Sequence, residues 1–257
     1  MSKSLTELHG PVHALFTDLD GTMATKGRLT AQTFASLQKL FSAGVPVVLV
    51  TGRPAGWGHA LANLLPFSAV ITENGGVSFV PAETGFRKEI AMPRAELRKW
   101  QAVMKEALVD ATKKVPGAQL SADSAYREVD LAIDWNEDAK LEAAQADRIM
   151  EMMHERGLAA TRSSVHVNYG PPGIDKWRAC ERILSSCFAH LNGSHDGIVY
   201  VGDSLNDAPV FAELEKSVGV ANVRDRWDQL EHKPNYITEQ AEGAGFSELV
   251  DRLLTLL

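Results

Sequence analysis

Residues 12–22 read VHALFTDLDGT, and this stretch decides how the rest of the chain is interpreted. Its first part is mostly apolar and predicts a short strand that ends at residue 17. Asp18 and Asp20 follow directly, and side chains two apart on an extended chain point to the same side, so both carboxylates address one site. Gly21 then lets the backbone turn sharply. The stretch therefore predicts a strand that delivers two carboxylates to one point.

Residues 1–80 alternate between strand and helix patterns on either side of this stretch. Apolar residues at helical spacing predict helices over 30–43 and 60–65, and Gly44 marks the end of the first helix. Continuous aliphatic runs at 46–50 and 69–72 are typical of strands that are buried on both faces. Strand–helix–strand units of this length predict a parallel sheet with right-handed crossovers.

The middle of the chain has a different pattern. Helical periodicity extends over 93–111 and 139–156, whereas residues 126–134 and 163–169 alternate between polar and apolar side chains. Alternation of this kind is typical of antiparallel strands that are covered by helices on one face only. The run Gly-Pro-Pro-Gly at 170–173 then interrupts the pattern, as a linker would.

After this linker the first pattern returns, with helices expected at 175–187, 208–214 and 246–257 and strands at 197–201, 218–221 and 236–238. Both ends of the chain therefore predict one α/β core, a doubly wound Rossmann-like parallel sheet, while the middle predicts a smaller inserted α+β domain. We expect the core to comprise residues 1–87 and 172–257, and the inserted domain to comprise residues 88–171.

Composition limits the classes of function. The 257 residues are 45% hydrophobic and 23% charged, as in globular proteins, and 26 Lys and Arg against 33 Asp and Glu leave a net charge of −7. This charge disfavours nucleic-acid binding, and no apolar run approaches the about 20 residues of a membrane helix. Residues 1–10 do not resemble a secretory signal. The two cysteines, Cys180 and Cys187, fit small buried side chains in a reducing cytoplasm. The oligomeric state is left open.

Three further segments carry polar groups at the ends of expected core strands or near a helix start. Thr51-Gly52-Arg53 follows the second strand, Lys176 comes just after the linker, and residues 202–207 (GDSLND) follow the strand after it. Because the carboxyl ends of parallel strands meet at one edge of a sheet, we expect these groups to join Asp18 and Asp20. Several carboxylates at one point favour a hard divalent cation such as Mg²⁺. Together they are the set that phosphoryl transfer needs.

Other interpretations of these segments fit the sequence less well. A calcium loop that begins at Asp18 would need glycine and glutamate at its sixth and twelfth positions, where the chain has Met23 and Leu29. Gly56 and Gly58 lack the third glycine of a dinucleotide-binding fingerprint, which weighs against an oxidoreductase.

The order and spacing of these motifs resemble the haloacid dehalogenase-like phosphohydrolase superfamily. More narrowly they resemble its Cof-like branch of sugar phosphatases, in which an α/β cap is inserted between the second and third motifs. Residues 18–22 match the first motif, Thr51 the second, Lys176 the third and residues 202–207 the fourth. Residues 71–76 (ITENGG) also resemble a recurrent segment of this branch. The branch includes mannosyl-3-phosphoglycerate, sucrose-phosphate and trehalose-phosphate phosphatases.

This resemblance implies a Mg²⁺-dependent phosphatase that works through an aspartyl-phosphate. Asp18 would attack phosphorus, and Asp20 would protonate the leaving oxygen and then deprotonate the attacking water. Mg²⁺ would be held by Asp18, the backbone carbonyl of Asp20 and Asp203, with Asp207 just outside its ligands. The groups implied to hold the phosphoryl oxygens are Thr51, Gly52, Lys176 and Asn206.

The resemblance also implies that the inserted domain closes over the site and selects the leaving group. In regular strands Glu128 and Asp130 would share one face, Arg127 would lie on the other, and His166 and Asn168 would lie together. Carboxylate, amide and imidazole groups recognise hydroxyl-rich ligands, so we expect a small phosphorylated metabolite, specifically a sugar or polyol phosphate. The candidate substrate-contacting residues are Arg53, Asn74, Arg127, Glu128, His166 and Asn168.

Two alternatives stay open. A phosphomutase of the same fold would return the phosphate to its sugar and release little free phosphate. A non-catalytic protein that binds a phosphate ligand would be expected to lack Asp18, Asp20 or Lys176, and all three are present.

Overall fold

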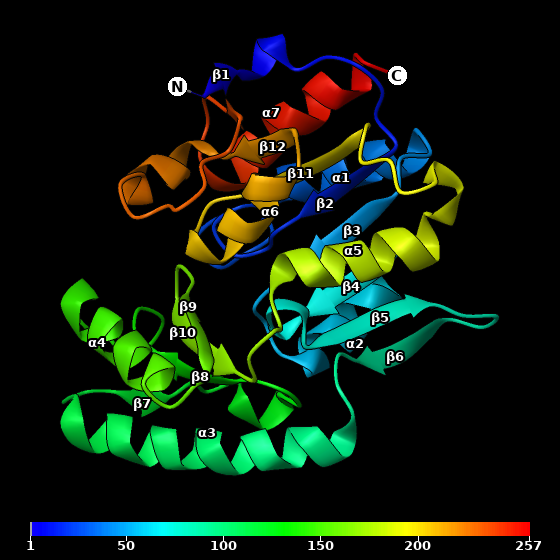
Figure 1. Cartoon of the computed structure of the whole chain (residues 1–257). Helices are drawn as coiled ribbons and strands as arrows, with labels where there is room; N and C mark the ends of the chain where they lie inside the picture. Colours follow the sequence, from blue (N-terminus) through cyan, green and yellow to red (C-terminus); the bar gives the residue numbers. More distant parts are fainter. Residues whose placement is uncertain (1) are drawn as a thin grey trace.

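The computed structural model describes residues 2–257 and contains a large sheet and a small sheet that belong to two adjoining units (Figure 1). The large sheet has nine strands in the order β1-β13-β12-β11-β2-β3-β4-β5-β6. These strands are β1 (Lys3–Ser4), β2 (Ala14–Thr17), β3 (Val47–Val50), β4 (Ala69–Thr72), β5 (Val77–Pro81), β6 (Phe86–Ile90), β11 (Ile198–Gly202), β12 (Lys216–Gly219) and β13 (Tyr236–Ile237).

The strand order of the large sheet reverses at β2. Both β3 and β11 pair with β2 in parallel, although they come from opposite parts of the chain. Every residue of β2, β3 and β11 is buried, as expected for short aliphatic strands that are covered on both faces. The carboxyl ends of these three strands lie side by side, and this is the point at which open α/β sheets bind their ligands.

Helices cover both faces of the large sheet. Three of them, α1, α2 and α7, share one hydrophobic cluster with the sheet, and α5 and α6 share another. Leu15 and Phe16, neighbours on β2, enter opposite clusters, because successive side chains of a strand alternate between its faces. The core is therefore doubly wound, as the sequence predicted. The helices are α1 (Ala31–Ser42), α2 (Ala55–Leu64), α5 (Lys176–Cys187), α6 (Ala208–Glu213) and α7 (Glu242–Leu254).

The small sheet is antiparallel, with the order β7-β8-β10-β9. Two long helices, α3 and α4, cover one of its faces through a third hydrophobic cluster. Figure 1 shows this sheet between those helices and the large sheet. Its other face reaches the ligand-binding edge of the large sheet, since the Asn168 amide bonds the Gly52 carbonyl. The elements are α3 (Arg94–Lys114), β7 (Gln119–Leu120), β8 (Leu131–Asp134), α4 (Ala143–His154), β9 (Ala159–Arg162) and β10 (His166–Gly170).

Short 3-10 helices complete the chain, namely η1 (Leu5–Glu7), η2 (Glu73–Gly75), η3 (Ser124–Tyr126), η4 (Ala189–Leu191), η5 (Leu205–Asp207) and η6 (Ala221–Arg226). The hairpin of β5 and β6 extends the large sheet in antiparallel fashion beyond β4. The domain boundary expected between residues 87 and 88 therefore falls inside β6.

The strand expected over 126–134 is regular only from Leu131 onward. Before it, the backbone N–H groups of residues 128–130 donate to the Glu73 carboxylate, so they are not available for sheet pairing. The prediction that Glu128 and Asp130 share a strand face was therefore wrong. Its physical reason is a buried acceptor from a distant part of the chain.

Two helices begin at different residues from those that the sequence predicted. The helix expected over 139–156 begins at Ala143, because the Asp134 carboxylate accepts the N–H groups of residues 137–139 and holds them in a loop. The helix expected over 60–65 begins at Ala55, whose N–H donates to Glu73. In both cases a carboxylate satisfies backbone donors at the start of the helix or just before it.

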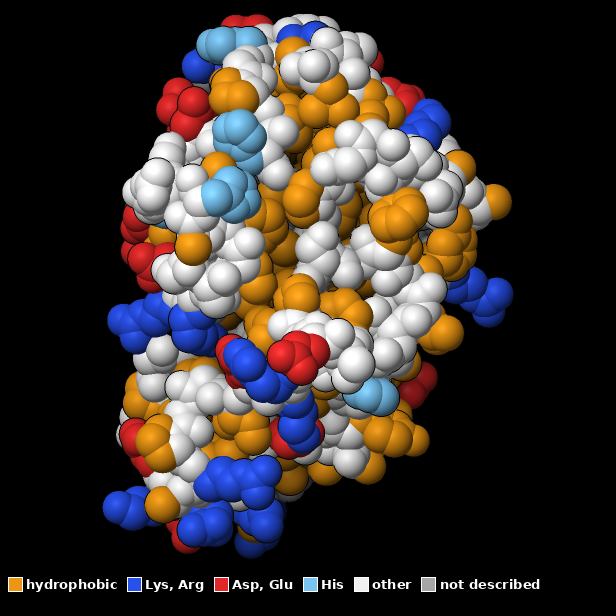
Figure 2. Space-filling model, turned by 90° about the vertical axis from the view of Figure 1, so that its right-hand side faces the viewer, with side chains coloured by type: hydrophobic (Ala, Val, Ile, Leu, Met, Phe, Trp, Pro, Cys, Tyr) orange, Lys and Arg blue, Asp and Glu red, His pale blue; other side chains and the backbone are white. Residues whose placement is uncertain are grey.

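Charged side chains are distributed unevenly over the surface. On the face seen in Figure 2, Lys and Arg side chains gather toward the lower end, where α3 lies in Figure 1. That helix packs on the face of the small sheet that points away from the large one. In the region that the structure describes, no helix combines the length and the apolar character needed to cross a membrane.

Candidate active site

Four buried side chains lie at the edge of the sheet where β2, β3 and β11 end, and three of them, Asp18, Lys176 and Asp203, lie close together. Asp18 follows β2, Thr51 follows β3, Asp203 follows β11, and Lys176 is the first residue of α5. All four are at most 4% exposed. The structure thus brings together residues from all four motifs, at the sheet edge where the strand order reverses.

Lys176 connects the first motif to the last. Its Nζ donates to Oδ1 of Asp18 at 2.8 Å and to Oδ1 of Asp207 at 2.6 Å. Burial alone would lower the pKa of this ammonium, but the two carboxylates outweigh burial and raise the pKa above its usual range. Lys176 therefore stays charged and holds the Asp18 carboxylate in one orientation.

Asp207 has hydrogen-bond donors on both of its carboxylate oxygens. Besides Lys176, Oδ1 accepts from the Tyr200 hydroxyl at 2.5 Å. Oδ2 accepts from the backbone N–H groups of Asp203 and Ser204, each at 2.9 Å. These contacts fix the loop after β11 and leave Asp207 with little capacity to bind a cation directly.

Asp203 lies opposite Asp18 and is held through its own oxygens. Oδ1 accepts from the Thr22 hydroxyl at 3.0 Å, and Oδ2 accepts from the Asn222 amide at 3.2 Å. Burial raises the pKa of Asp203 well above its usual range, and the nearby Asp18 and Asp207 carboxylates raise it further. In the same way, burial raises the pKa of Asp18 to about 7.

This carboxylate cluster fits Mg²⁺. Oxygens of Asp18, Asp203 and Asp207 lie within 4.8 Å of one another, and a hard cation relieves their mutual repulsion. The loop after β2 lies against Asp203, since a Cβ added to Gly21 would lie 2.6 Å from Oδ2 of that residue. The loops that carry Asp18 and Asp203 are therefore close enough to share one ion. Only glycine permits this approach of the loop after β2, so the donor set and the backbone agree.

The groups expected to hold phosphate lie beside Asp18. Gly52 and Asn206 line the same pocket as Asp18, and the Thr51 hydroxyl accepts the N–H of the residue two positions later at 3.1 Å. The Asn206 amide donates to Oδ1 of Asn74 at 2.9 Å. Within residues 2–257, the buried Nδ2 of Asn74 has no hydrogen-bond partner, so this donor is free for a ligand oxygen.

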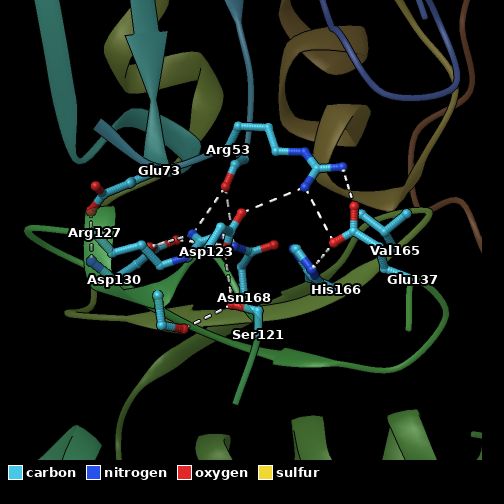
Figure 3. Close-up of polar contacts among 12 residues, drawn as sticks. Arg53, Glu73, Ser121, Asp123, Arg127, Asp130, Glu137, Val165, His166 and Asn168 are labelled. Atoms are coloured by element: carbon cyan, nitrogen blue, oxygen red, sulfur yellow. Dashed lines mark hydrogen bonds and ion pairs between the residues drawn. The ribbon is translucent and has the colours of Figure 1, made fainter. Parts of the chain in front are cut away.

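Arg53 lies between the carboxylates of Asp20 and Glu137, and Figure 3 shows its contact with Glu137. Its Nε and Nη2 donate to the two oxygens of Asp20, each at 2.9 Å. On its other edge, Nη2 and Nη1 donate to the two oxygens of Glu137 at 2.8 and 3.3 Å. The guanidinium also stacks on the Trp57 ring, 4.6 Å from its centroid. One buried arginine thereby joins the expected general acid to a loop of the small-sheet unit.

The expected small-sheet residues His166 and Asn168 both face the site, as their alternation on β10 predicted. The His166 ring, 2% exposed, contacts Glu137 through Nε2 at 2.9 Å. The Asn168 amide reaches both the Gly52 carbonyl at 3.3 Å and Asp130 at 3.1 Å. Figure 3 shows these side chains pointing toward the loop after β3.

Arg127 and Glu128 have different positions from each other. Arg127 is buried; its Nη1 donates to the Gly52 carbonyl at 3.0 Å and to Asp130 at 2.7 Å (Figure 3). Glu128 instead pairs with Lys88 at 2.5 Å, with both side chains more than a third exposed. The structure therefore does not bring the Glu128 carboxylate to the site, since the chain before β8 is not a strand.

Glu73 is a residue whose part in the site we did not predict. Its carboxylate is 1% exposed and accepts four backbone N–H groups, from Ala55 and from residues 128–130, at 2.6 to 3.0 Å. Glu73 and Asn74 both have φ of +51°, a conformation that non-glycine residues seldom adopt. This strained turn directs one carboxylate from the large-sheet unit onto the small-sheet unit.

The two units leave little space over Asp18. The pocket between Asp18, Asp20 and His166 encloses about 10 Å³, roughly the room that one water needs. A cavity of about 230 Å³ lies beside it and shares Asn168 and Asn206 with it. The contacts described here therefore belong to a closed arrangement of the two units.

The sequence carried a weak signal for some of the residues we missed and none for others. Glu73 stands in the segment at 71–76 that we singled out, yet nothing there indicated its partners. Tyr200 is an uncommon polar-tipped residue in a buried strand, and such a hydroxyl needs a partner, which is Asp207. Glu137 stands in a polar run before a helix, which is typical of ordinary surface loops.

Comparison with known proteins agrees with this geometry. A model of the haloacid dehalogenase-like hydrolases matches residues 15–110 and 133–249. A phosphoglycolate phosphatase of Methanothermobacter thermautotrophicus is 26% identical over 245 residues, which are 95% of this chain and 99% of that protein. A phosphoglycolate phosphatase of Halorubrum lacusprofundi is 32% identical over 216 residues, 82% of this chain and 85% of that protein.

Solved structures share the fold. A protein of Thermoplasma acidophilum has a TM-score of 0.74 at 19% identity, covering 96% of this chain and 100% of that one. The sucrose-phosphatase of Synechocystis has a TM-score of 0.67 at 16% identity, covering 95% and 98%. These likenesses extend over both sheets, so the α/β architecture as a whole occurs in other proteins.

Proposed function

The chain belongs to the haloacid dehalogenase-like hydrolase family and is a phosphatase, and from this premise we propose that it hydrolyses small phosphomonoesters with Mg²⁺ through a phosphorylated Asp18. The observation that carries the proposal is the buried contact among Asp18, Lys176 and Asp207, with Asp203 close by. A carboxylate fixed by a charged lysine, beside a cation site, is suited to attack a phosphoryl group.

In the first step, an oxygen of Asp18 forms a bond to phosphorus while the bond from phosphorus to the ester oxygen breaks. The electron pair of that bond stays on the leaving oxygen, which takes a proton from Asp20. In the second step, water attacks the phosphorus of the aspartyl-phosphate and gives its proton to Asp20. The P–O bond to Asp18 breaks, and inorganic phosphate leaves.

Asp20 has to be released from Arg53 to do this work. In the closed arrangement both oxygens of Asp20 accept from the guanidinium, so neither is directed at a leaving group. Its position two residues after Asp18 supports the assignment, because the pocket that encloses Asp18 also includes Asp20. We propose that substrate changes this contact when it enters.

Mg²⁺ would be held by Asp18, Asp203 and the backbone carbonyl of Asp20, and when bound it neutralises charge on the phosphoryl oxygens. Thr51, Gly52 and Asn206 would bind those oxygens, together with the free Nδ2 of Asn74. Lys176 adds a fixed positive charge. A non-catalytic phosphate binder would not need the Asp18–Asp20 pair, which favours the enzyme over that alternative.

For the substrate we propose 2-phosphoglycolate as the first compound to test. Its support is that relatives spanning nearly the whole chain carry the name phosphoglycolate phosphatase. A sugar or polyol phosphate, as expected from the sequence, is the second candidate. The polar groups around the 230 Å³ cavity support it, among them the unpartnered Oδ1 of Asn168 and hydroxyl of Tyr169, as far as residues 2–257 show.

We also propose that the inserted segment, residues 88–171 apart from the end of β6, acts as the cap of this site. Its support is the set of contacts that its side chains make with the loop after β3, including Arg127 and Asn168 on the Gly52 carbonyl. Closure of such a unit excludes water and positions the leaving group.

The experiment is phosphate release from a panel of phosphorylated metabolites, with Mg²⁺ and with EDTA, by the wild type and by Asp18→Asn. We expect Asp18→Asn to lose at least about 10⁴-fold in kcat, because the nucleophile is gone. Asp138→Asn, which removes a carboxylate from an exposed loop position, is the matched control and should stay within twofold of the wild type. Equal turnover in Asp18→Asn would remove this residue from the nucleophile role.

The same assay separates the alternatives. A phosphomutase would release little free phosphate and would require a bisphosphate activator, whereas a phosphatase releases phosphate and needs no activator. Acid quenching of a substrate labelled in its phosphoryl group should trap label on the wild type and none on Asp18→Asn. If the wild type with Mg²⁺ released no phosphate from any compound, the non-catalytic alternative would replace our proposal.

A further inference from the structure

Glu137 is a carboxylate from the small-sheet unit that contacts two residues lining the pocket over Asp18, namely Arg53 and His166 (Figure 3). Its two oxygens accept from Nη2 and Nη1 of Arg53 at 2.8 and 3.3 Å, and Oε2 also contacts Nε2 of His166 at 2.9 Å. This is a planar, two-point contact of guanidinium and carboxylate with an imidazole added on one side. Such geometry is the usual way in which proteins bind a free carboxylate.

The two partners, Arg53 and His166, and the carboxylate differ in how exposed their side chains are. The side chains of Arg53 and His166 are 5% and 2% exposed. Arg53 is also fixed by Asp20 and by stacking on Trp57. Glu137 has a side chain that is 35% exposed and stands in the loop between β8 and α4. The two residues of the cradle are therefore buried, while the carboxylate that occupies it is partly exposed and comes from a loop.

The Glu137 side chain is negatively charged in this contact. The hydrogen bond with His166 and the contact with Arg53 hold the pKa of Glu137 at about 2. Glu137 thus remains a carboxylate at any pH at which the enzyme would work. The cradle always contains an anion in the closed arrangement, and that anion is part of the protein.

The cradle adjoins the reacting groups. Arg53 bonds Asp20 with one edge and Glu137 with the other, and the pocket above Asp18 is lined by Asp20, Arg53 and His166. With Asp18 attacking phosphorus from below, the leaving group of a substrate would extend toward these residues. Glu137 is not itself among the residues that line this pocket, but it contacts two that are, Arg53 and His166.

We propose that Arg53 and His166 form a subsite for a carboxylate on the leaving group, and that Glu137 occupies this subsite in the closed enzyme as an internal competitor. The inference rests on the proposed function and narrows its substrate class to phosphorylated hydroxycarboxylic acids, in which the carboxylate stands one carbon away from the phosphate ester. A substrate of this class displaces Glu137 and takes over its contacts with Arg53 and His166.

The charges around Arg53 favour replacement of Glu137 by the substrate carboxylate over binding of both carboxylates at once. Arg53 already faces three carboxylates, Asp20, Glu137 and Asp123. A substrate that brought a phosphate and a carboxylate next to them would meet strong repulsion. Departure of Glu137 removes one negative charge as the carboxylate of the substrate arrives, so the charge around Arg53 stays the same.

The test compares two substrates of nearly equal size, 2-phosphoglycolate and 2-hydroxyethyl phosphate, in which a hydroxymethyl group replaces the carboxylate. In Glu137→Gln we expect KM for 2-phosphoglycolate to fall about tenfold, since the subsite no longer has a charged internal competitor. KM for 2-hydroxyethyl phosphate should change less than twofold. Asp138→Asn, one residue later in the same loop, controls for the loss of one negative charge and should leave both KM values within twofold.

A second variant tests the cradle itself. His166→Asn should lower the ratio of kcat/KM for 2-phosphoglycolate over 2-hydroxyethyl phosphate by about tenfold, because one partner of the carboxylate is lost. Binding of 2-phosphoglycolate to the turnover-deficient Asp18→Asn protein, measured by calorimetry, gives a readout that is independent of catalysis. Adding Glu137→Gln to that protein should tighten binding by the same factor of about ten.

Three results would overturn the inference. The first is a KM for 2-phosphoglycolate that rises in Glu137→Gln, which would make Glu137 a residue that only holds the units closed. The second is an equal change of KM for both substrates. The third is a wild type that hydrolyses 2-hydroxyethyl phosphate as efficiently as 2-phosphoglycolate; the proposed phosphatase activity would then stand while the carboxylate subsite would not.

Discussion

The two halves of the site are built in different ways. The half around Asp18, Lys176 and Asp207 is buried within the large-sheet unit, and its residues lie on or directly after elements of that unit, namely β2, α5 and η5. The half around Arg53 and Glu137 crosses between the two units, and Glu137 comes from a partly exposed loop. The contacts of the first half lie within one unit and stay the same when the units separate, whereas separation breaks the contacts of the second half.

This difference indicates a division of labour between chemistry and selection. Groups that must stay aligned with phosphorus are held by the backbone and by contacts within one core. Groups that must admit and recognise a leaving group are held by contacts between the two units. Variants in the first half should therefore damage the reaction and the fold together, and variants in the second should act on closure and substrate choice.

The largest effect is expected from Lys176→Met. This change leaves two carboxylates buried without their counterion, so the free energy of unfolding should fall by about 3–5 kcal/mol and kcat by about 10³-fold. Urea unfolding and phosphate release measure the two effects. Lys39→Met, which breaks an exposed ion pair with Asp251, should cost no more than about 1 kcal/mol. A loss below 1 kcal/mol in Lys176→Met would mean that the first half is not a single unit.

The next effect is expected from Glu73→Gln, which addresses the contact between the halves. The amide replaces an oxygen that accepts from the backbone with an N–H group that cannot, so closure should be weakened. Amide hydrogen exchange at residues 128–130 should accelerate about tenfold to a hundredfold, as loss of a charged acceptor implies. Exchange in β2 and β11 should be unchanged. Unfolding of the whole chain at the same rate would contradict the separation that we describe.

A smaller effect is expected from pH on Mg²⁺ binding. Burial raises the pKa of Asp18 to about 7, so below that pH the ion must displace a proton, and above it the carboxylate is already ionised. Affinity for Mg²⁺ should therefore rise with pH, up to about tenfold per unit between pH 6 and 7 for each proton released, and level off above. Calorimetry in buffers of different ionisation enthalpy counts the protons. An affinity that is the same at pH 6 and pH 8 would exclude this linkage.

The smallest effect is expected from Glu128→Gln. Its ion pair with Lys88 is at the surface, and such pairs contribute about 0–1 kcal/mol. Both kinetic constants should stay within twofold for 2-phosphoglycolate, in contrast to Glu137→Gln nine residues later. A larger change in KM would show that Glu128 reaches the substrate after all, as we expected from alternation in a strand.

The sequence predicted the first half well for a physical reason. Asp18, Thr51 and Asp203 each come directly after a short aliphatic run, and the end of a buried parallel strand fixes where the next residue lies. The strand β4 has the predicted bounds, and α1 and β3 lie within the predicted ranges. Prediction here requires only local patterns and the rule that parallel strand ends meet at one edge.

The contacts of the second half could not be predicted from the sequence, because they join segments that lie far apart along the chain. Glu137 and Arg53 meet because two sheets close on each other, and no periodicity in either segment records that contact. The irregular chain at residues 127–130 depends on Glu73, more than fifty positions earlier, so the alternating pattern predicted a strand that does not form. The buried Glu73 carboxylate takes the N–H groups of residues 128–130, and this contact overrides the local preference of these residues for a strand.

The narrow space above Asp18 also has a consequence for how fast the enzyme can work. Since this space has room for about one water, we expect an organic phosphate to enter and inorganic phosphate to leave only when the two units move apart. Every round of hydrolysis then contains an opening event, and the frequency of that event is a ceiling on turnover that improvements in the chemical step cannot lift. Because solvent drag slows this motion, we expect turnover to fall as the viscosity of the medium rises.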